Sequence, residues 1–216
     1  MAYFPFMIEV ENARILIAGG GRSALWKVKA LSGFGADLVV AAPSVLPELR
    51  ERERAGEIRI LLQPYRPDLL EGTVCVVAAT GDPEKNRSIA ADCGARGIPC
   101  NAVDDPAHSD FIFPAVLRRE NYTLAVSTDG KSPLMARKIK ERAAEALPEE
   151  FDRATGALGD MRAQVLREEK DPGKRMHIFE AAAQRLLAGE CSGADAGEGS
   201  RADAGEKAEN TAAKDK

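Results

Sequence analysis

Short apolar runs alternate with amphipathic, charged stretches over the first half of the chain. Five runs have the length and composition of buried strands, at 14–19, 36–43, 57–63, 73–80 and 98–103. Between them, apolar positions recur at helical spacing at 23–32, 45–55 and 83–96. Strands that alternate with helices indicate a parallel sheet with crossover helices, so the pattern predicts a doubly wound, Rossmann-type α/β domain.

The pattern changes in the second half of the chain. A further strand is predicted at 122–128, followed by a helix for which Ser132 supplies the N-cap and Pro133 the first residue. Beyond Leu147 the sequence is helical and strongly charged, without strand signals. This helical stretch ends at about Ala188. From Gly189 to Lys216 the residues are small and charged with little apolar surface to bury, so this tail is expected to be disordered.

Composition narrows the classes of function. The net charge is −4 with both signs interspersed, which argues against a nucleic-acid or membrane-surface partner. The apolar runs are too short to span a membrane, and the N-terminus lacks the features of a secretory signal, so a cytoplasmic protein is expected. The four cysteines form no CxxC pair and are interpreted as reduced core thiols: Cys75, Cys93, Cys100 and Cys191. Trp26 could be a stacking platform, but its place inside a helix favours ordinary packing.

A glycine turn follows the first predicted strand. Gly19-x-Gly21-x-x-Ala24 satisfies the dinucleotide fingerprint with alanine at its third position. Gly19 would make the sharp turn, Gly21 would admit a pyrophosphate, and Ala24 would let helix and strand pack closely. Backbone N–H groups from Arg22 and Ser23 onward would then point at the phosphate. The alternative is a glycine-rich bend that binds no ligand.

The end of the second predicted strand bears on the choice of cofactor. It offers Ala41, Ala42, Pro43 and Ser44, so neither a carboxylate for the ribose nor an arginine for a 2′-phosphate stands there. Ribose contacts would come from the backbone at Pro43 and from Ser44, with Thr80 at the end of the fourth strand as a further cofactor contact. This arrangement favours NAD over NADP.

Three motifs follow later predicted strands and identify a family. They read ATGDPEKN, CNAVDDPAHSDFIFP and STDGKSPLMARKIKER. Together with the glycine turn, they resemble the precorrin-2 dehydrogenase/sirohydrochlorin ferrochelatase family, which forms the N-terminal module of siroheme synthase. The resemblance runs from about Tyr3 to Leu147 and continues more loosely beyond. Gly81 and Asp129 depart from the family pattern, in loops expected near the nicotinamide or the substrate.

The resemblance implies a domain organisation and a set of partners. Residues 1–112 would form the NAD-binding Rossmann domain, 113–147 a dimerisation and substrate segment, 148–190 a small helical domain and 191–216 the tail. A homodimer is expected. The chain looks like the stand-alone form, which would receive a tetrapyrrole from a separate uroporphyrinogen methyltransferase.

The resemblance also implies a reaction and site residues. The reaction would be NAD-dependent oxidation of precorrin-2 to sirohydrochlorin, with insertion of Fe²⁺ as a second activity that the sequence leaves open. Asp104 occupies the position of the general acid/base, whereas Asp105 beside it does not align. The expected substrate-binding residues are Asn101, Thr128, Lys131, Ser132 and Arg137.

Other interpretations compete with this one. Asp104 and Asp105 could simply begin a turn before Pro106, and His108 is interpreted as a turn residue, not a metal ligand. A non-enzymatic NAD(H)-sensing module would explain the Rossmann pattern but gives NAVDDP and FIFP no role. An unrelated small dehydrogenase would need a Tyr-x-x-x-Lys pair, which the sequence does not contain.

Overall fold

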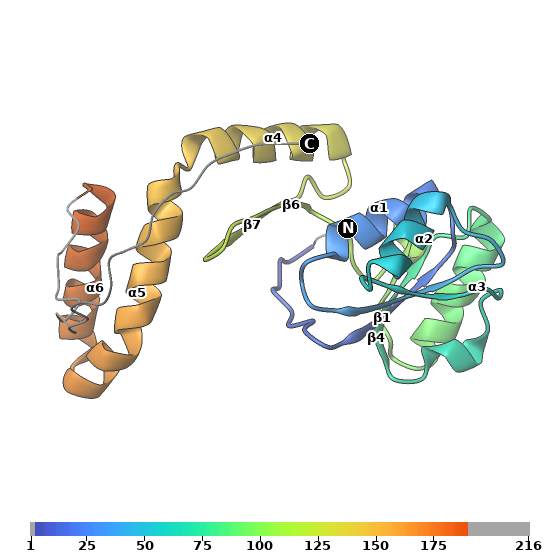
Figure 1. Cartoon of the computed structure of the whole chain (residues 1–216), viewed down its shortest axis with the longest axis horizontal. Helices are drawn as coiled ribbons and strands as arrows, with labels where there is room; N and C mark the ends of the chain where they lie inside the picture. Colours follow the sequence, from blue (N-terminus) through green and yellow to red (C-terminus); the bar gives the residue numbers. More distant parts are fainter. Residues whose placement is uncertain (1–2, 190–216) are drawn as a thin grey trace, which may run out of the picture. The chain divides into compact units, whose positions relative to one another are not determined.

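The computed structural model describes residues 3–189, and the expected disordered tail at 191–216 lies outside them. The chain divides into two compact units, Met1–Pro148 and Glu149–Lys216. The first unit contains the strands, and the described part of the second is helical (Figure 1).

A five-stranded parallel sheet forms the centre of the first unit. Its strand order is β3-β2-β1-β4-β5, and β1 pairs with β2 on one side and with β4 on the other. In this register Ile17 of β1 lies opposite Val40 and Val77, so the central strands bury continuous apolar runs. The strands are β1 Arg14–Ala18, β2 Asp37–Ala41, β3 Arg59–Leu61, β4 Thr73–Ala78 and β5 Cys100–Ala102.

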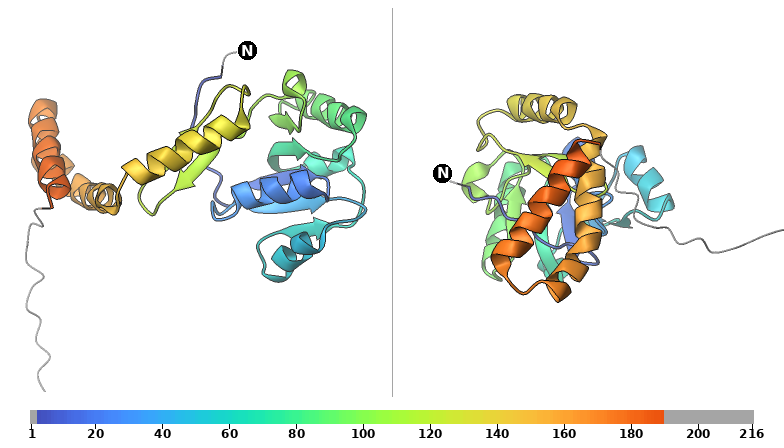
Figure 2. Two further views of the ribbon diagram at one scale, coloured as in Figure 1. Left: turned by 90° about the horizontal axis from the view of Figure 1, so that it is seen from above. Right: turned by 90° about the vertical axis from the view of Figure 1, so that its left-hand side faces the viewer.

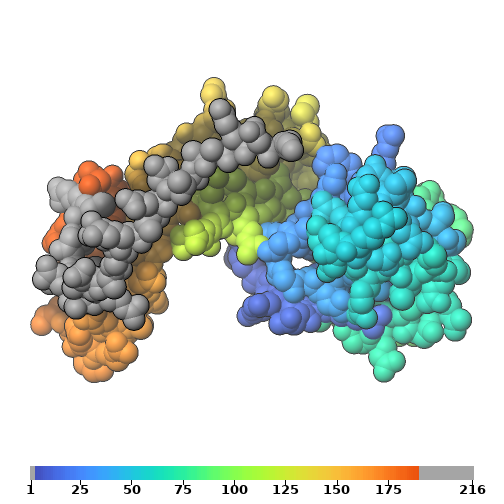
Figure 3. All heavy atoms as spheres, in the orientation of Figure 1, coloured from blue at the N-terminus to red at the C-terminus, as the bar shows by residue number. Residues whose placement is uncertain are grey.

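Helices cover both faces of this sheet, because successive side chains of each buried strand point to opposite faces and both sets are apolar. Ile15 and Ile17 of β1 pack in one cluster with α1 (Arg22–Leu31) and α2 (Pro47–Arg54). Leu16 and Ala18 pack in the other cluster with α3 (Pro83–Gly94) and a 3₁₀ helix at Pro67–Leu70. In the space-filling view the segment around α2 forms the near face of the unit (Figure 3). The predicted doubly wound Rossmann-type fold is confirmed.

The strand predicted at 122–128 exists but does not extend the parallel sheet. β7 (Thr123–Val126) pairs antiparallel with β6 (Ala115–Arg118), and α4 (Pro133–Ala146) packs on this two-stranded sheet. β6 was not predicted from the sequence because three of its four residues are only half-buried, and the fourth, Arg118, is exposed and charged. Residues after β7 are therefore not at the carboxyl edge of the parallel sheet.

The described part of the second unit is a pair of helices. α5 (Glu149–Glu168) and α6 (Pro172–Leu187) pack against each other, shown in orange in Figure 2. The Asp171 carboxylate caps α6 by accepting a hydrogen bond from the N–H of Lys174 at 2.9 Å. The absence of strand signals beyond Leu147 agrees with this helical hairpin.

Two expectations about single residues have different outcomes. Cys93 and Cys100 are fully buried as free thiols, and burial raises the pKa of the half-buried Cys75 thiol to about 11. Cys191 lies outside the described residues. Trp26 is 65% exposed, so the expectation that it packs within its helix is wrong. It lies between Leu25 and Lys27, on the side of α1 away from the buried Ala24 and Val28.

Within residues 3–189, no helix is long and apolar enough to cross a membrane.

Candidate cofactor and acid–base site

The three glycines after β1 meet very different surroundings. A Cβ on Gly19 would lie 2.0 Å from the carbonyl oxygen of Ala79, and a Cβ on Gly20 would lie 2.0 Å from that of Ser44. A Cβ on Gly21 would meet no atom within 4 Å. Gly19 and Gly20 therefore allow close backbone packing, whereas Gly21 faces open space that a ligand can enter. The packing role of Gly20 was missed, although the triple glycine was its signal.

The first turn of α1 suits an anionic group. Gly21 is the N-cap residue and supplies no side-chain hydrogen bond to the helix. Amide N–H groups at an uncapped helix start need an acceptor, and the helix dipole favours a negative charge there. Arg22 is exposed and Ser23 half-buried, while Ala24 is fully buried in the core beside β1. These residues fit the pyrophosphate of a dinucleotide.

The chain segments after β2 and β4 close around the glycine turn. The N–H of Leu46 donates to the carbonyl of Gly20 at 2.9 Å, which fastens the exposed loop of Pro43 and Ser44 to the turn. On the other side, Gly19 touches the backbone of Ala79 and Thr80. The structure thus brings the predicted cofactor residues after β1, β2 and β4 together at one edge of the sheet.

A buried asparagine positions Thr80. The Asn86 side-chain oxygen on α3 accepts hydrogen bonds from the Thr80 N–H at 3.0 Å and from its hydroxyl at 2.7 Å. Asn86 is only 4% exposed, so these bonds are sheltered from water. Sequence reasoning assigned Asn86 no role, although it closes the ATGDPEKN motif.

The adjacent aspartates after β5 have separate roles. Asp105 binds Arg87 Nε at 3.0 Å and His108 Nδ1 at 2.9 Å, and these two partners hold the pKa of its carboxyl below the ordinary value. Asp104 has φ 61°, a left-handed conformation that aspartate tolerates, and it is exposed. Within residues 3–189 its carboxylate accepts no hydrogen bond. The Asp104 carboxylate is therefore accessible to a ligand, whereas the Asp105 carboxylate is bound to Arg87 and His108.

A lysine on α1 faces this turn. The Lys27 ammonium lies 3.7 Å from the centroid of the Phe113 ring. Burial lowers the pKa of Lys27 to about 8, and the negative charge of Asp104 opposes that shift. The charge of Asp104, in the turn after β5, therefore acts on the Lys27 ammonium of α1. Lys27 is the lysine of the family pattern GGGxxAxxK that begins at Gly19, and sequence reasoning assigned it no role of its own.

Asn101 lies beneath this site as a buried residue of β5. Its side-chain N–H donates to the carbonyl of Phe111 at 2.9 Å. The side-chain oxygen is buried without a partner in the described structure, and the residue is 7% exposed. Asn101 therefore anchors the segment that carries Phe111 and Phe113 under Lys27.

The other predicted substrate-binding residues belong to the second sheet. The N–H of Ser132 donates to the Thr128 hydroxyl at 3.1 Å, so this pair closes the turn before α4. Lys131 and Arg137 are exposed. Because they follow β7, the rule that gathers ligand-binding residues at the carboxyl edge of a parallel sheet does not bring them to the glycine turn.

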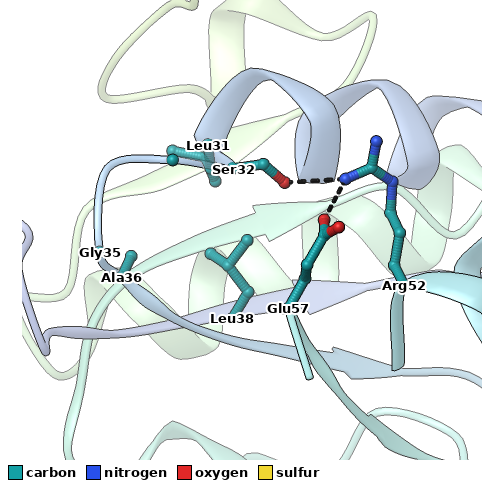
Figure 4. Close-up of a pocket in the computed structure, with 8 residues that line it drawn as sticks. Leu31, Ser32, Gly35, Ala36, Leu38, Arg52 and Glu57 are labelled. Atoms are coloured by element: carbon teal, nitrogen blue, oxygen red, sulfur yellow. Dashed lines mark hydrogen bonds and ion pairs between the residues drawn. The ribbon is translucent and has the colours of Figure 1, made fainter. Parts of the chain in front are cut away.

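A pocket of about 630 Å³ lies elsewhere in the first unit (Figure 4). It is lined by the last turn of α1, the loop into β2 and two side chains that close it, Arg52 and Glu57. Arg52 binds both Glu57 and the Ser32 hydroxyl. Since this pocket is at the amino edge of β2, it is not the dinucleotide site, which lies at the carboxyl edge.

Comparison with known proteins relates this geometry to a family. A family sequence model described as "Putative NAD(P)-binding" matches residues 6–115, just over half of the chain. Siroheme synthase of Chromobacterium violaceum is 37% identical over 188 residues, which cover 87% of this chain and 40% of that protein. Siroheme synthase of Azotobacter vinelandii is 35% identical over 195 residues, covering 88% and 42%. The chain therefore spans about two fifths of the length of these relatives.

A solved structure shares the fold. The precorrin-2 dehydrogenase SirC superposes with a TM-score of 0.62 at 23% identity, over 87% of this chain and 98% of that one. The matched family region contains the glycine turn, the Pro43–Ser44 loop, Thr80 and Asp104. The chain belongs to this family of NAD(P)-binding proteins.

Proposed function

We propose that the protein oxidises precorrin-2 to sirohydrochlorin with NAD⁺ as hydride acceptor. One observation carries the proposal: the exposed, unbonded carboxylate of Asp104 follows β5 at the same sheet edge where the uncapped glycine turn follows β1. The relatives named siroheme synthase and the fold of a precorrin-2 dehydrogenase support this substrate class. We expect the reaction to take place in the cytoplasm.

The residues of the glycine turn fit a dinucleotide. The N–H groups of Arg22 and Ser23 would bind the pyrophosphate, and Gly21 leaves room for it. Ser44 and the backbone beside Pro43 would contact the ribose, without a carboxylate or an arginine at that position. When bound, NAD⁺ supplies the acceptor for a hydride. The absence of a cation for a 2′-phosphate favours NAD over NADP.

Asp104 would act as the general base. Oxidation of precorrin-2 removes one hydride and one proton, and the Asp104 carboxylate would take the proton. Asp104 has a left-handed backbone and is exposed, and its carboxylate has no competing hydrogen bond within the described residues. The same carboxylate would accept pyrrole protons if Fe²⁺ is a second substrate. Insertion of Fe²⁺ into sirohydrochlorin, a ferrochelatase activity, would be this second step.

Thr128, Lys131, Ser132 and Arg137 would serve the substrate from a second copy of the chain. A homodimer is supported by exposed apolar side chains on α4, with Leu134 60%, Met135 51% and Ile139 46% exposed. A separate methyltransferase would supply precorrin-2 to this dimer.

The test is an absorbance time course with enzymatically prepared precorrin-2. We expect sirohydrochlorin to form with NAD⁺ faster than with NADP⁺, and addition of Fe²⁺ to cause a second spectral change. Asp104→Asn should abolish oxidation, because asparagine accepts the left-handed backbone but cannot take a proton. Asp105→Asn is the matched control, next in sequence and engaged with Arg87 and His108, and it should remain active. NAD⁺ binding without any oxidation by the wild type would favour the sensor interpretation and contradict the proposal.

A further inference from the structure

Within residues 3–189, the Lys27 ammonium packs against an aromatic ring but forms no ion pair. It lies over the Phe113 ring, 3.7 Å from the ring centroid, and the charge of Asp104 in the turn after β5 acts on it. Within residues 3–189, this nitrogen forms no ion pair with a carboxylate and donates no hydrogen bond. The residue is only partly exposed. A partly buried ammonium with unsatisfied donors gains strongly from an anionic ligand.

We propose that Lys27 binds a carboxylate of the tetrapyrrole substrate beside Asp104. This inference rests on the proposed function and assigns one carboxylate-binding position within it. The carboxylate would satisfy the ammonium donors and direct the adjoining edge of the macrocycle toward the Asp104 base. Phe113 would hold the lysine in place and present an apolar surface next to the ring system.

Lys27 suits this role better than the exposed cations of the second sheet. Lys131 and Arg137 are solvated, so an ion pair with either would be weakened by water and salt. Lys27 has already lost part of its hydration on the folded protein, so a new carboxylate meets less competition from solvent. Lys29 provides a comparison on the same helix: it is exposed and lies 5.6 Å from the Trp26 ring.

The affinity of Lys27 for a carboxylate should depend on pH. Burial lowers the pKa of Lys27 to about 8, and Asp104 is the ionisable group on the described elements whose charge acts on it. Phe113, the other group packed against the ammonium, does not titrate. Carboxylate binding favours the charged lysine, so affinity should fall as pH rises through about 8. An arginine at this position would stay charged and remove that fall.

The experiment measures binding of sirohydrochlorin by absorbance titration at pH 7 and pH 9.5. It compares the wild type with Lys27→Met, Lys27→Arg and the matched control Lys29→Met. At pH 7 we expect Lys27→Met to bind roughly tenfold to a hundredfold more weakly. Lys27→Arg and Lys29→Met should bind within about threefold of the wild type. The wild type and Lys29→Met should lose affinity at pH 9.5, whereas Lys27→Arg should lose little.

NAD⁺ titrations of the same proteins separate the roles of the two ligands. Equal NAD⁺ affinity in all four proteins would support a substrate role. Parallel losses for NAD⁺ and sirohydrochlorin in Lys27→Met would assign the lysine to the cofactor or to folding and would overturn the inference. Unchanged sirohydrochlorin binding in Lys27→Met would also overturn it and leave the proposed reaction intact. A wild type that binds no sirohydrochlorin and oxidises no precorrin-2 would refute the proposed function itself.

Discussion

The carbonyl oxygen of Ala79 lies 2.0 Å from the position that a Cβ would occupy on Gly19. This contact joins the turn after β1 to the end of β4, two strands that are neighbours in the sheet but far apart in sequence. Gly19 also has φ 137°, which disfavours any side chain. The backbone path at the proposed pyrophosphate site therefore depends on the absence of one methyl group.

Substitution of this glycine should damage folding more than ligand chemistry. We expect Gly19→Ala to lower the free energy of unfolding by about 2 kcal/mol or more, because the new Cβ collides with backbone and the φ is strained. Gly21→Ala meets open space and should keep wild-type stability while it weakens NAD⁺ binding. Urea unfolding followed by the fluorescence of Trp26, the single tryptophan, and NAD⁺ titration distinguish the two effects. Equal stability of the two variants would contradict this explanation.

Loss of the buried amide on α3 should loosen the loop after β4. Asn86→Ala removes the acceptor of both Thr80 hydrogen bonds and should lower the free energy of unfolding by about 1–3 kcal/mol. NAD⁺ binding should weaken because Thr80 is no longer held. The exposed Ser88 on the same helix offers a control, Ser88→Ala, which should leave both measurements unchanged. A fully stable Asn86→Ala protein would show that Thr80 is positioned by other contacts.

The Asp105 network should make stability sensitive to acid. His108 and Arg87 hold the pKa of Asp105 below its ordinary value of 3.8 in the folded protein. The folded state therefore binds this proton less readily than the unfolded state, so the stabilisation is complete above about pH 4 and is lost as pH falls through the lowered pKa. Urea midpoints between pH 2.5 and 6 should fall less steeply on acidification in Asp105→Asn than in the wild type. Identical slopes would count against the network.

The cap of α4 can be separated from a substrate role. The Ser132 hydroxyl accepts a hydrogen bond from the N–H of Met135 at 3.2 Å. Ser132→Ala should lower the free energy of unfolding by about 1 kcal/mol, whereas Ser132→Asn should restore the cap. If Ser132 also binds substrate through its hydroxyl, the KM for precorrin-2 should rise in both variants. If the KM instead rises in Ser132→Ala and returns to the wild-type value in Ser132→Asn, as stability does, Ser132 has the capping role alone.

The sequence by itself determined the α/β class and the glycine turn after β1. These features depend on local causes: apolar runs of strand length, helical spacing, and glycines where a strand turns into a helix. The resemblance to the family selected Asp104 in place of Asp105 as the acid/base, and this stays a prediction; in the structure Asp105 is bound to Arg87 and His108.

Tertiary structure decided which residues meet. Gly20 and Asn86 act through contacts with Ser44 and Thr80, and no periodicity predicts such contacts. The partly buried state of Lys27 depends on Phe113, which is far away in the sequence. The placement of β7 depended on a partner, β6, whose few half-buried residues carry too weak a pattern to be recognised alone. Sequence periodicity predicts which face of each segment is buried. The segment that packs against this face is determined only when the strands pair and the helices pack.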